Sequence, residues 1–174
     1  MSTKIYLSRK LESVVSKSLV NTGEKETDHP LGKWTATLFY VSHKKCLLIT
    51  NSLTRYTIIV DRVTAADFAN ITDRFAMTLY DQILFDGIKT DWPTIHQLVG
   101  RVDLFSTDND RKLIGTQNNM LYILDYWKRE FGAIDNWPFR EINGRINGMP
   151  TKELKWLFPR EKMKIVLDGL NANK

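Results

Sequence analysis

Apolar residues recur along the chain with two different periods, and the period indicates which segments form strands and which form helices. Alternating or continuous apolar runs predict three strands at 33–42, 45–51 and 56–61. Because their connections are short, we expect an antiparallel meander with the first of these strands in a central position. Further strands are predicted at 4–7 and 101–105.

Apolar residues spaced three or four apart predict helices in the rest of the chain. Ser8 is placed to cap a first helix that continues to Leu19, and Thr64 with Asp67 marks the start of another. The most regular apolar stripe belongs to the segment that ends at Gly132. The other predicted helices cover 92–99, 139–147 and 160–170.

This order of elements predicts an α+β fold, in which an antiparallel β-meander sheet packs with several helices. We expect a single domain over 1–174, with 133–174 as a helical C-terminal extension of the same domain. The one obvious loop, 21–32, contains Gly, Pro and a run of charged residues. It links elements and does not separate domains.

The charge and the cysteine content indicate which kind of partner and which cellular compartment to expect. Lys and Arg exceed Asp and Glu by 25 to 20, which favours approach to nucleic acid or another polyanion. No segment has the roughly 20 consecutive apolar residues that cross a bilayer, so no membrane association is predicted. The single cysteine, Cys46, lies in an apolar run, which excludes an internal disulfide and predicts a buried thiol in a reducing cytoplasm.

Recognised catalytic patterns do not occur in the sequence. There is no P-loop, dinucleotide-binding glycine pattern or nucleophile elbow, so we predict no cofactor and assign no catalytic residue. The three histidines lie far apart in the sequence, which gives no metal-ligand spacing, and no metal site is predicted. The aspartates are expected to be solvated or to cap helices, because no spacing pairs two of them for acid–base work.

Four blocks carry a resemblance to a known family, at 34–39, 44–51, 109–119 and 147–150. They contain Trp-Thr-Ala-Thr-Leu, Lys-Cys-Leu-Leu-Ile-Thr-Asn, Asn-Asp-Arg-Lys-Leu-Ile-Gly-Thr-Gln-Asn and Asn-Gly-Met-Pro. In this order they resemble an uncharacterised bacterial domain family, a domain of unknown function. The resemblance spans most of the chain and implies no particular activity.

Three positions depart from the pattern of that family. Thr37 stands where the family has Asn, Gln117 where it has Met, and Asn119 where it has Asp. If that Asp is a catalytic carboxylate in the relatives, this chain lacks it.

The segment 106–119 is the first candidate site, because polar residues gather there where a strand passes into a helix. Free amide groups at a helix start, together with an arginine, can hold a phosphate or a carboxylate. The alternative is structural, since Ser, Thr, Asp and Asn are the ordinary caps of such a helix. The ligand-binding candidates are Asn109, Arg111, Gln117, Asn118 and Asn119.

The second candidate is the segment 140–174, which holds eight basic against four acidic residues. Basic residues interleaved with aromatic ones support phosphate contacts together with base stacking. The alternative is that the aromatic residues cover the core while lysine side chains solvate its outer face. The nucleic-acid candidates are Arg145, Lys152, Lys155, Trp156, Arg160, Lys162 and Lys164.

Three functions follow as hypotheses. The first is a non-enzymatic binding or accessory protein, associated with nucleic acid and linked to mobile elements. The spacing of Asn147, Pro150, Leu154 and Pro159 is also similar to the tail of insertion-element transposases, although no acidic triad accompanies it. The second is an enzyme that binds an anionic substrate at 109–119, and the third is a protein-interaction module of a toxin or defence system that binds another protein. The sequence does not indicate the oligomeric state.

Overall fold

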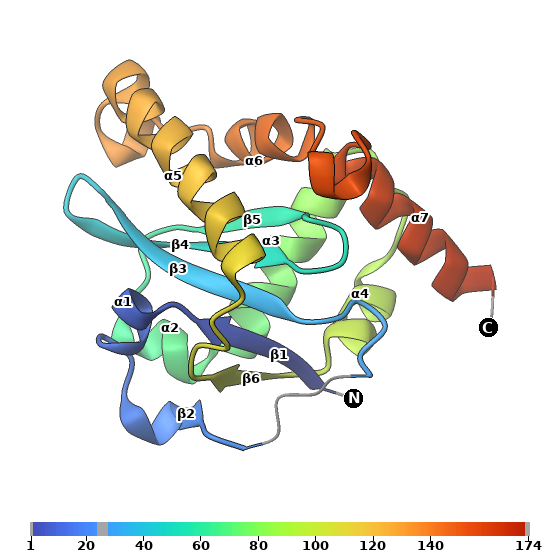
Figure 1. Cartoon of the computed structure of the whole chain (residues 1–174), viewed down its shortest axis with the longest axis horizontal. Coiled ribbons are helices and arrows are strands. Elements are labelled where there is room, and N and C mark those ends of the chain that lie inside the picture. The colour runs from blue at the N-terminus through green and yellow to red at the C-terminus, as the bar shows by residue number, and fades with distance from the viewer. Residues whose placement is uncertain (1, 24–27, 173–174) are drawn as a thin grey trace.

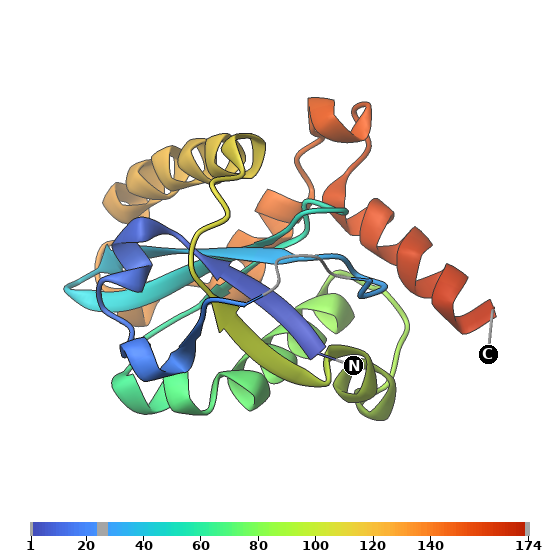
Figure 2. The same ribbon diagram turned by 60° about the horizontal axis from the view of Figure 1, so that its bottom comes forward.

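A computed structural model describes residues 2–23 and 28–172 and contains a mixed six-stranded sheet with helices on both faces (Figures 1 and 2). Residues 24–27 of the predicted loop lie outside the described residues. The strands are β1 (Ser2–Leu7), β2 (Val20–Asn21), β3 (Trp34–Val41), β4 (Lys44–Asn51), β5 (Thr57–Val60) and β6 (Arg101–Phe105). Their order in the sheet is β2-β6-β1-β3-β4-β5.

The α+β class is confirmed, but the expectation of a purely antiparallel sheet is wrong. Strands β3, β4 and β5 form the predicted antiparallel meander. Strand β1, however, pairs in parallel with both β3 and β6, and β2 pairs in parallel with β6. Parallel neighbours need long connections, and the chain supplies them: one runs through 8–33, and α2, α3 and α4 lie between β5 and β6.

The helices lie in two layers with the sheet between them (Figure 2). Helix α5 covers one face, while α2, α3 and α4 cover the other (Figures 1 and 2). The α-helices are α1 (Arg9–Glu12), α2 (Ala65–Ala69), α3 (Ile71–Phe85), α4 (Trp92–Val99), α5 (Arg111–Phe131), α6 (Phe139–Asn147) and α7 (Pro159–Ala172). The described residues also contain three single turns of 3-10 helix, η1 (Lys17–Leu19), η2 (Ile134–Asn136) and η3 (Lys152–Leu154).

The predicted starts of the helices agree with the structure better than their predicted lengths do. The Ser8 side chain accepts a hydrogen bond from the Leu11 amide, and Thr64 with Asp67 forms a capping box. Helix α1 nevertheless ends at Glu12, far short of the predicted Leu19. A helix of one turn has little stability of its own, so its length depends on tertiary contacts that periodicity does not contain.

The β3–β4 hairpin closes through two residues with left-handed backbone angles. Ser42 has φ 47° and His43 has φ 63°. Turns of this kind match the twist of the flanking strands, and they fix the register that pairs Val41 with Lys44. His43 is therefore an exposed turn residue, while Cys46 points into the core.

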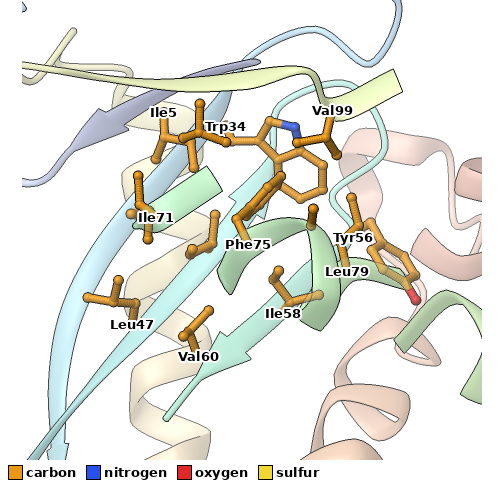
Figure 3. Close-up of a cluster of buried hydrophobic side chains, with 14 of the residues drawn as sticks. Ile5, Trp34, Leu47, Tyr56, Ile58, Val60, Ile71, Phe75, Leu79 and Val99 are labelled. Atoms are coloured by element: carbon orange, nitrogen blue, oxygen red, sulfur yellow. The ribbon is translucent and has the colours of Figure 1, made fainter. Parts of the chain in front are cut away.

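The larger core fills the space between the sheet and α3 and α4. Trp34 from β3 is fully buried, and its ring meets that of Phe75 edge-on at a centroid distance of 5.1 Å (Figure 3). Leu79 and Ile83 continue the buried stripe of α3, and Met163 of α7 belongs to the same cluster. Aromatic and branched side chains of this size supply the main driving force for folding.

A second core lies between the other face of the sheet and α5. Phe39, Cys46 and Leu48 of the sheet pack there with Leu124 and Trp127 of α5. The prediction of a buried thiol is confirmed, and burial raises the pKa of Cys46. This thiol is therefore less able to ionise than an exposed one.

Within the described residues, the model contains no helix that is long and apolar enough to cross a membrane.

Candidate binding surface

Gln117, one of the ligand-binding candidates, lies inside the molecule. Its side chain is 2% exposed, and its amide nitrogen donates to the carbonyls of Thr35 at 2.8 Å and Leu48 at 3.2 Å. These bonds tie α5 to two neighbouring strands of the sheet. A buried amide needs such partners, so Gln117 serves the scaffold in this structure.

Two asparagines of α6, one turn apart, hold the edge of β5. The Asn143 side chain accepts a hydrogen bond from the Ile59 amide at 3.1 Å. Asn147 accepts from the Thr57 amide at 2.8 Å and donates to the Thr57 carbonyl at 3.0 Å. The two side chains thus take the place of a further strand, which explains the first residue of the Asn-Gly-Met-Pro block.

Asn51 has a comparable role at the end of β4. Its side-chain oxygen accepts bonds from the Leu53 and Thr54 amides, at 3.0 Å and 2.8 Å. Its nitrogen donates to the Leu31 carbonyl at 2.7 Å. The amide side chains at the ends of two family blocks therefore shape the backbone.

Charged residues from two distant parts of the sequence stabilise the start of α5. Asp110 caps the helix through the Leu113 amide, and Lys33 forms ion pairs with both Asp108 and Asp110. Burial acts to raise the pKa of Asp110, but the cap hydrogen bond, Lys33 and Arg55 together outweigh it, so that the pKa is lowered. Lys33 precedes β3 in sequence, so only the fold places it here.

The other candidates from 109–119 are exposed but do not converge. Asn109 has φ 56° and accepts a hydrogen bond from Arg9 at 3.4 Å. Arg111 and Asn119 line one hollow, whereas Asn118 is exposed elsewhere on α5 and does not line it.

That hollow, which we call the Arg111 hollow, has a volume of about 490 Å³. Arg111 and Asn119 of α5 line one side, and Met149, Thr151 and Glu153 from the segment after α6 line another. The Thr151 hydroxyl is buried and has no hydrogen-bond partner among the described residues.

A second hollow, which we call the Asp86 hollow, has a volume of about 680 Å³. It is lined by Asp86 after α3, by Arg145 of α6 and by Arg160 of α7. Met149 lines both hollows, so they adjoin on either side of the 148–150 turn. The two candidate regions of the sequence, separated by about 20 residues, therefore meet at one surface, which we call the two-hollow surface.

Asp86 is the most perturbed carboxylate of this surface. Tyr56, which is fully buried, donates to it at 2.5 Å, and Gln82 and Asn147 donate at 3.0 Å and 3.3 Å. Burial raises the pKa of Asp86, and this effect exceeds the opposing effect of the three donors and of Arg160. Burial and the neighbouring Asp86 also raise the pKa of Tyr56, which therefore stays protonated.

The raised pKa of Asp86 predicts a pH-dependent stability. The folded protein favours the neutral form of Asp86. The contribution of Asp86 to the free energy of unfolding is therefore complete below the pKa of an aspartate in the unfolded chain, about 3.9, and is lost as the pH rises through the higher pKa of Asp86 in the folded protein. In urea titrations at several pH values, the wild type should lose stability relative to Asp86→Asn over that window. A difference that is constant, or that changes in the opposite sense, contradicts a raised pKa.

Several of the basic candidate residues form no ion pair within the described part of the chain, although Arg160 acts electrostatically on Asp86, which lines the same hollow. Among the described residues, the side chains of Arg111, Arg145 and Arg160 form no ion pair, although Arg140 pairs with Asp81. The same holds for Lys152, Lys155, Lys162 and Lys164. Arg145 lies over the rings of Trp127 and Phe131, at 5.7 Å and 5.9 Å from the centroids, and Arg160 lies over Phe158 at 5.7 Å. Aromatic support orders these guanidinium groups without neutralising them.

The sequence did not identify Asp86 and Tyr56 as site residues, because the hydrogen bond between them joins positions 30 residues apart. Asp86 was expected to be solvated or capping, and its position just before Gly87 gave no contrary signal. The repeat Asn143, Asn147 was a usable signal, since an i, i+4 pair of amides on an apolar helix face needs buried partners.

The geometry defines an α+β protein with a mixed sheet, an edge strand held by helix side chains, and two adjoining hollows lined in part by unpaired arginines. A family model described as "Domain of unknown function (DUF6933)" matches residues 4–162, and the chain belongs to this family. The match covers the Arg111 and Asp86 hollows and ends within α7. Comparisons with curated proteins and with solved structures found no match.

Proposed function

We propose that this protein is a non-enzymatic binding protein whose partner is nucleic acid, bound at the two-hollow surface. The observation that carries the proposal is that Arg111, Arg145 and Arg160 line the two hollows and form no ion pair among the described residues, although Asp86, Glu141 and Glu153 also line them. Elsewhere on the described molecule, Lys33, Arg62, Arg74, Arg101 and Lys128 are paired with aspartates, while Lys17 and Lys44 form no ion pair; the feature particular to this surface is that three such arginines line adjoining hollows.

Unpaired cations favour a polyanion for a physical reason. Each phosphate that a protein neutralises releases condensed counterions, so affinity depends on how many free cations reach the backbone. A cation that already has a carboxylate partner must break that pair first. Arg111 and Arg145 form no ion pair among the described residues and need no such exchange, which supports them as phosphate contacts; Arg160 also forms no ion pair, although Asp86 lines the same hollow.

The test measures the affinity for labelled single-stranded and duplex oligonucleotides by fluorescence anisotropy over a range of salt concentrations. The wild type should bind at low salt, with log K falling linearly against log salt. The triple variant Arg111→Ala, Arg145→Ala, Arg160→Ala should lower the magnitude of that slope by about 2–3, roughly one for each lost phosphate contact.

Lys17→Ala is the matched control. Lys17 is an exposed residue of η1, next to β2, which is the sheet edge opposite to β5. Its replacement should leave the salt slope unchanged. If the wild type binds neither kind of oligonucleotide at roughly 50 mM salt, where electrostatic binding is strong, nucleic acid is not the partner.

A further inference from the structure

The segment between α6 and α7 projects from the body of the protein. Figure 2 shows it rising from the sheet on the side of α5, before the chain turns into α7. Its base is closed by two hydrogen bonds, from the Trp156 amide to the Thr151 carbonyl at 2.8 Å and from the Thr151 amide to the Leu157 carbonyl at 3.3 Å. The residues between these bonds, including η3, form a compact tip.

Two consecutive residues of this tip have left-handed backbone angles. Lys155 has φ 55° and Trp156 has φ 67°. Such angles are uncommon for residues other than glycine, and for a side chain as bulky as tryptophan they are an outlier. The left-handed backbone angle of Trp156 therefore costs conformational free energy at the residue with the largest side chain of the tip.

The Trp156 ring is left in solvent by this backbone. It is 67% exposed and makes no aromatic contact with the other described residues. By contrast, Trp34 is fully buried, and Trp127 and Trp137 are 7% and 5% exposed. The tip thus presents a free aromatic face.

The charges around this ring favour an anionic partner. Lys152 and Lys155 are exposed on the same tip with Glu153, and Arg160 follows with Glu161 in the first turn of α7, so basic residues exceed acidic ones by three to two. Two other exposed aromatic residues, Tyr122 and Tyr126 of α5, lie on either side of Asp125 in sequence, and Lys128 is already paired with that aspartate. Phe85 is also exposed and lines the Asp86 hollow with Arg145 and Arg160, whereas the Trp156 ring belongs to the projecting tip and is more exposed, with Lys152 and Lys155 beside it.

We propose that Trp156 is the stacking platform for an unpaired nucleobase, with Lys152, Lys155 and Arg160 contacting the phosphates on either side. The inference rests on the proposed function and names its ligand as single-stranded nucleic acid. Bases of a duplex are stacked on one another and do not offer a face to an external ring, whereas those of a single strand do. The protein therefore binds single strands in preference to duplexes of the same length.

The test compares the wild type with Trp156→Ala and Trp156→Phe, using anisotropy with a short oligothymidine and with a duplex of equal length. Trp156→Ala should weaken single-strand binding by about 10-fold, since one base–aromatic stack contributes roughly 1–3 kcal/mol. Duplex binding should change by less than about 2-fold, because it depends on phosphate contacts. Trp156→Phe should recover most of the lost affinity.

The outcomes separate this inference from the function on which it rests. If the wild type binds no nucleic acid, both fail. If it binds both forms and Trp156→Ala weakens them equally, or weakens neither, the stacking role is overturned while nucleic-acid binding stands. Melting curves should show equal stability for all three proteins, which ties any loss of affinity to the ring itself.

Discussion

Replacing Trp34 by alanine is expected to destabilise the fold by about 3–5 kcal/mol, the usual range for emptying a fully buried tryptophan site. Trp34 is 0% exposed and packs edge-on against Phe75 in the larger core. The cavity would lie between β3 and α3, where neither element can close it without shifting the sheet. Urea denaturation should show a lower midpoint, and the melting temperature should fall by roughly 10 °C.

Two matched variants sharpen this test. Trp156→Ala removes the same side chain from an exposed position and should change stability by less than about 0.5 kcal/mol. Trp34→Phe keeps most of the ring volume and removes the indole N–H of Trp34, which has no partner among the described residues. It should therefore cost much less than Trp34→Ala. Equal losses for Trp34→Ala and Trp156→Ala would contradict the described packing of Trp34.

Replacing Asn147 by alanine is expected to cost about 2–4 kcal/mol, because it leaves buried backbone groups of β5 without partners. Asn147 is 0% exposed and bonds to both the amide and the carbonyl of Thr57. It also donates to Asp86 at 3.3 Å, so one side chain connects β5, α6 and the residue after α3. Chemical denaturation monitored by circular dichroism would measure the loss.

Asn147→Leu distinguishes hydrogen bonding from volume. Leucine fills the space but offers no amide, so it should not restore the stability lost in Asn147→Ala. Asn118→Ala, at an exposed position of α5, is the control and should lie within about 0.5 kcal/mol of the wild type. Rescue by leucine would mean that Asn147 acts through packing alone.

The elements that depend on local sequence were predicted well. Strand β6 and helix α6 have the predicted bounds, and helix α5 ends just before Gly132 as predicted. The position of β1 was not predictable in the same way. Its pairing with β3 and β6 joins residues about 30 and 100 positions apart, and nothing in a six-residue strand specifies such partners.

The candidate surface was predicted only in part, for a related reason. Arg111, Arg145 and Arg160 were singled out by residue type, and the fold places them at adjoining hollows. Gln117 was a candidate because it belongs to a polar block, but its spacing from Leu113 and Met120 already places it on the apolar face of α5, and it lies toward the sheet while Asn118 and Asn119 are exposed. Whether a residue of a polar helical segment is exposed thus depends on the helix face on which it lies, and composition alone does not show that face.

The way in which α6 holds β5 also bears on how copies of this protein behave toward one another. An open strand edge is a template on which another chain can add a strand and begin aggregation. On one side of this sheet the outward-pointing groups of Thr57 and Ile59 are already bonded to Asn147 and Asn143, and on the other side β2 is only two residues long. Both borders therefore resist edge-to-edge growth, and a variant that frees β5 should precipitate more readily than its loss of stability alone explains.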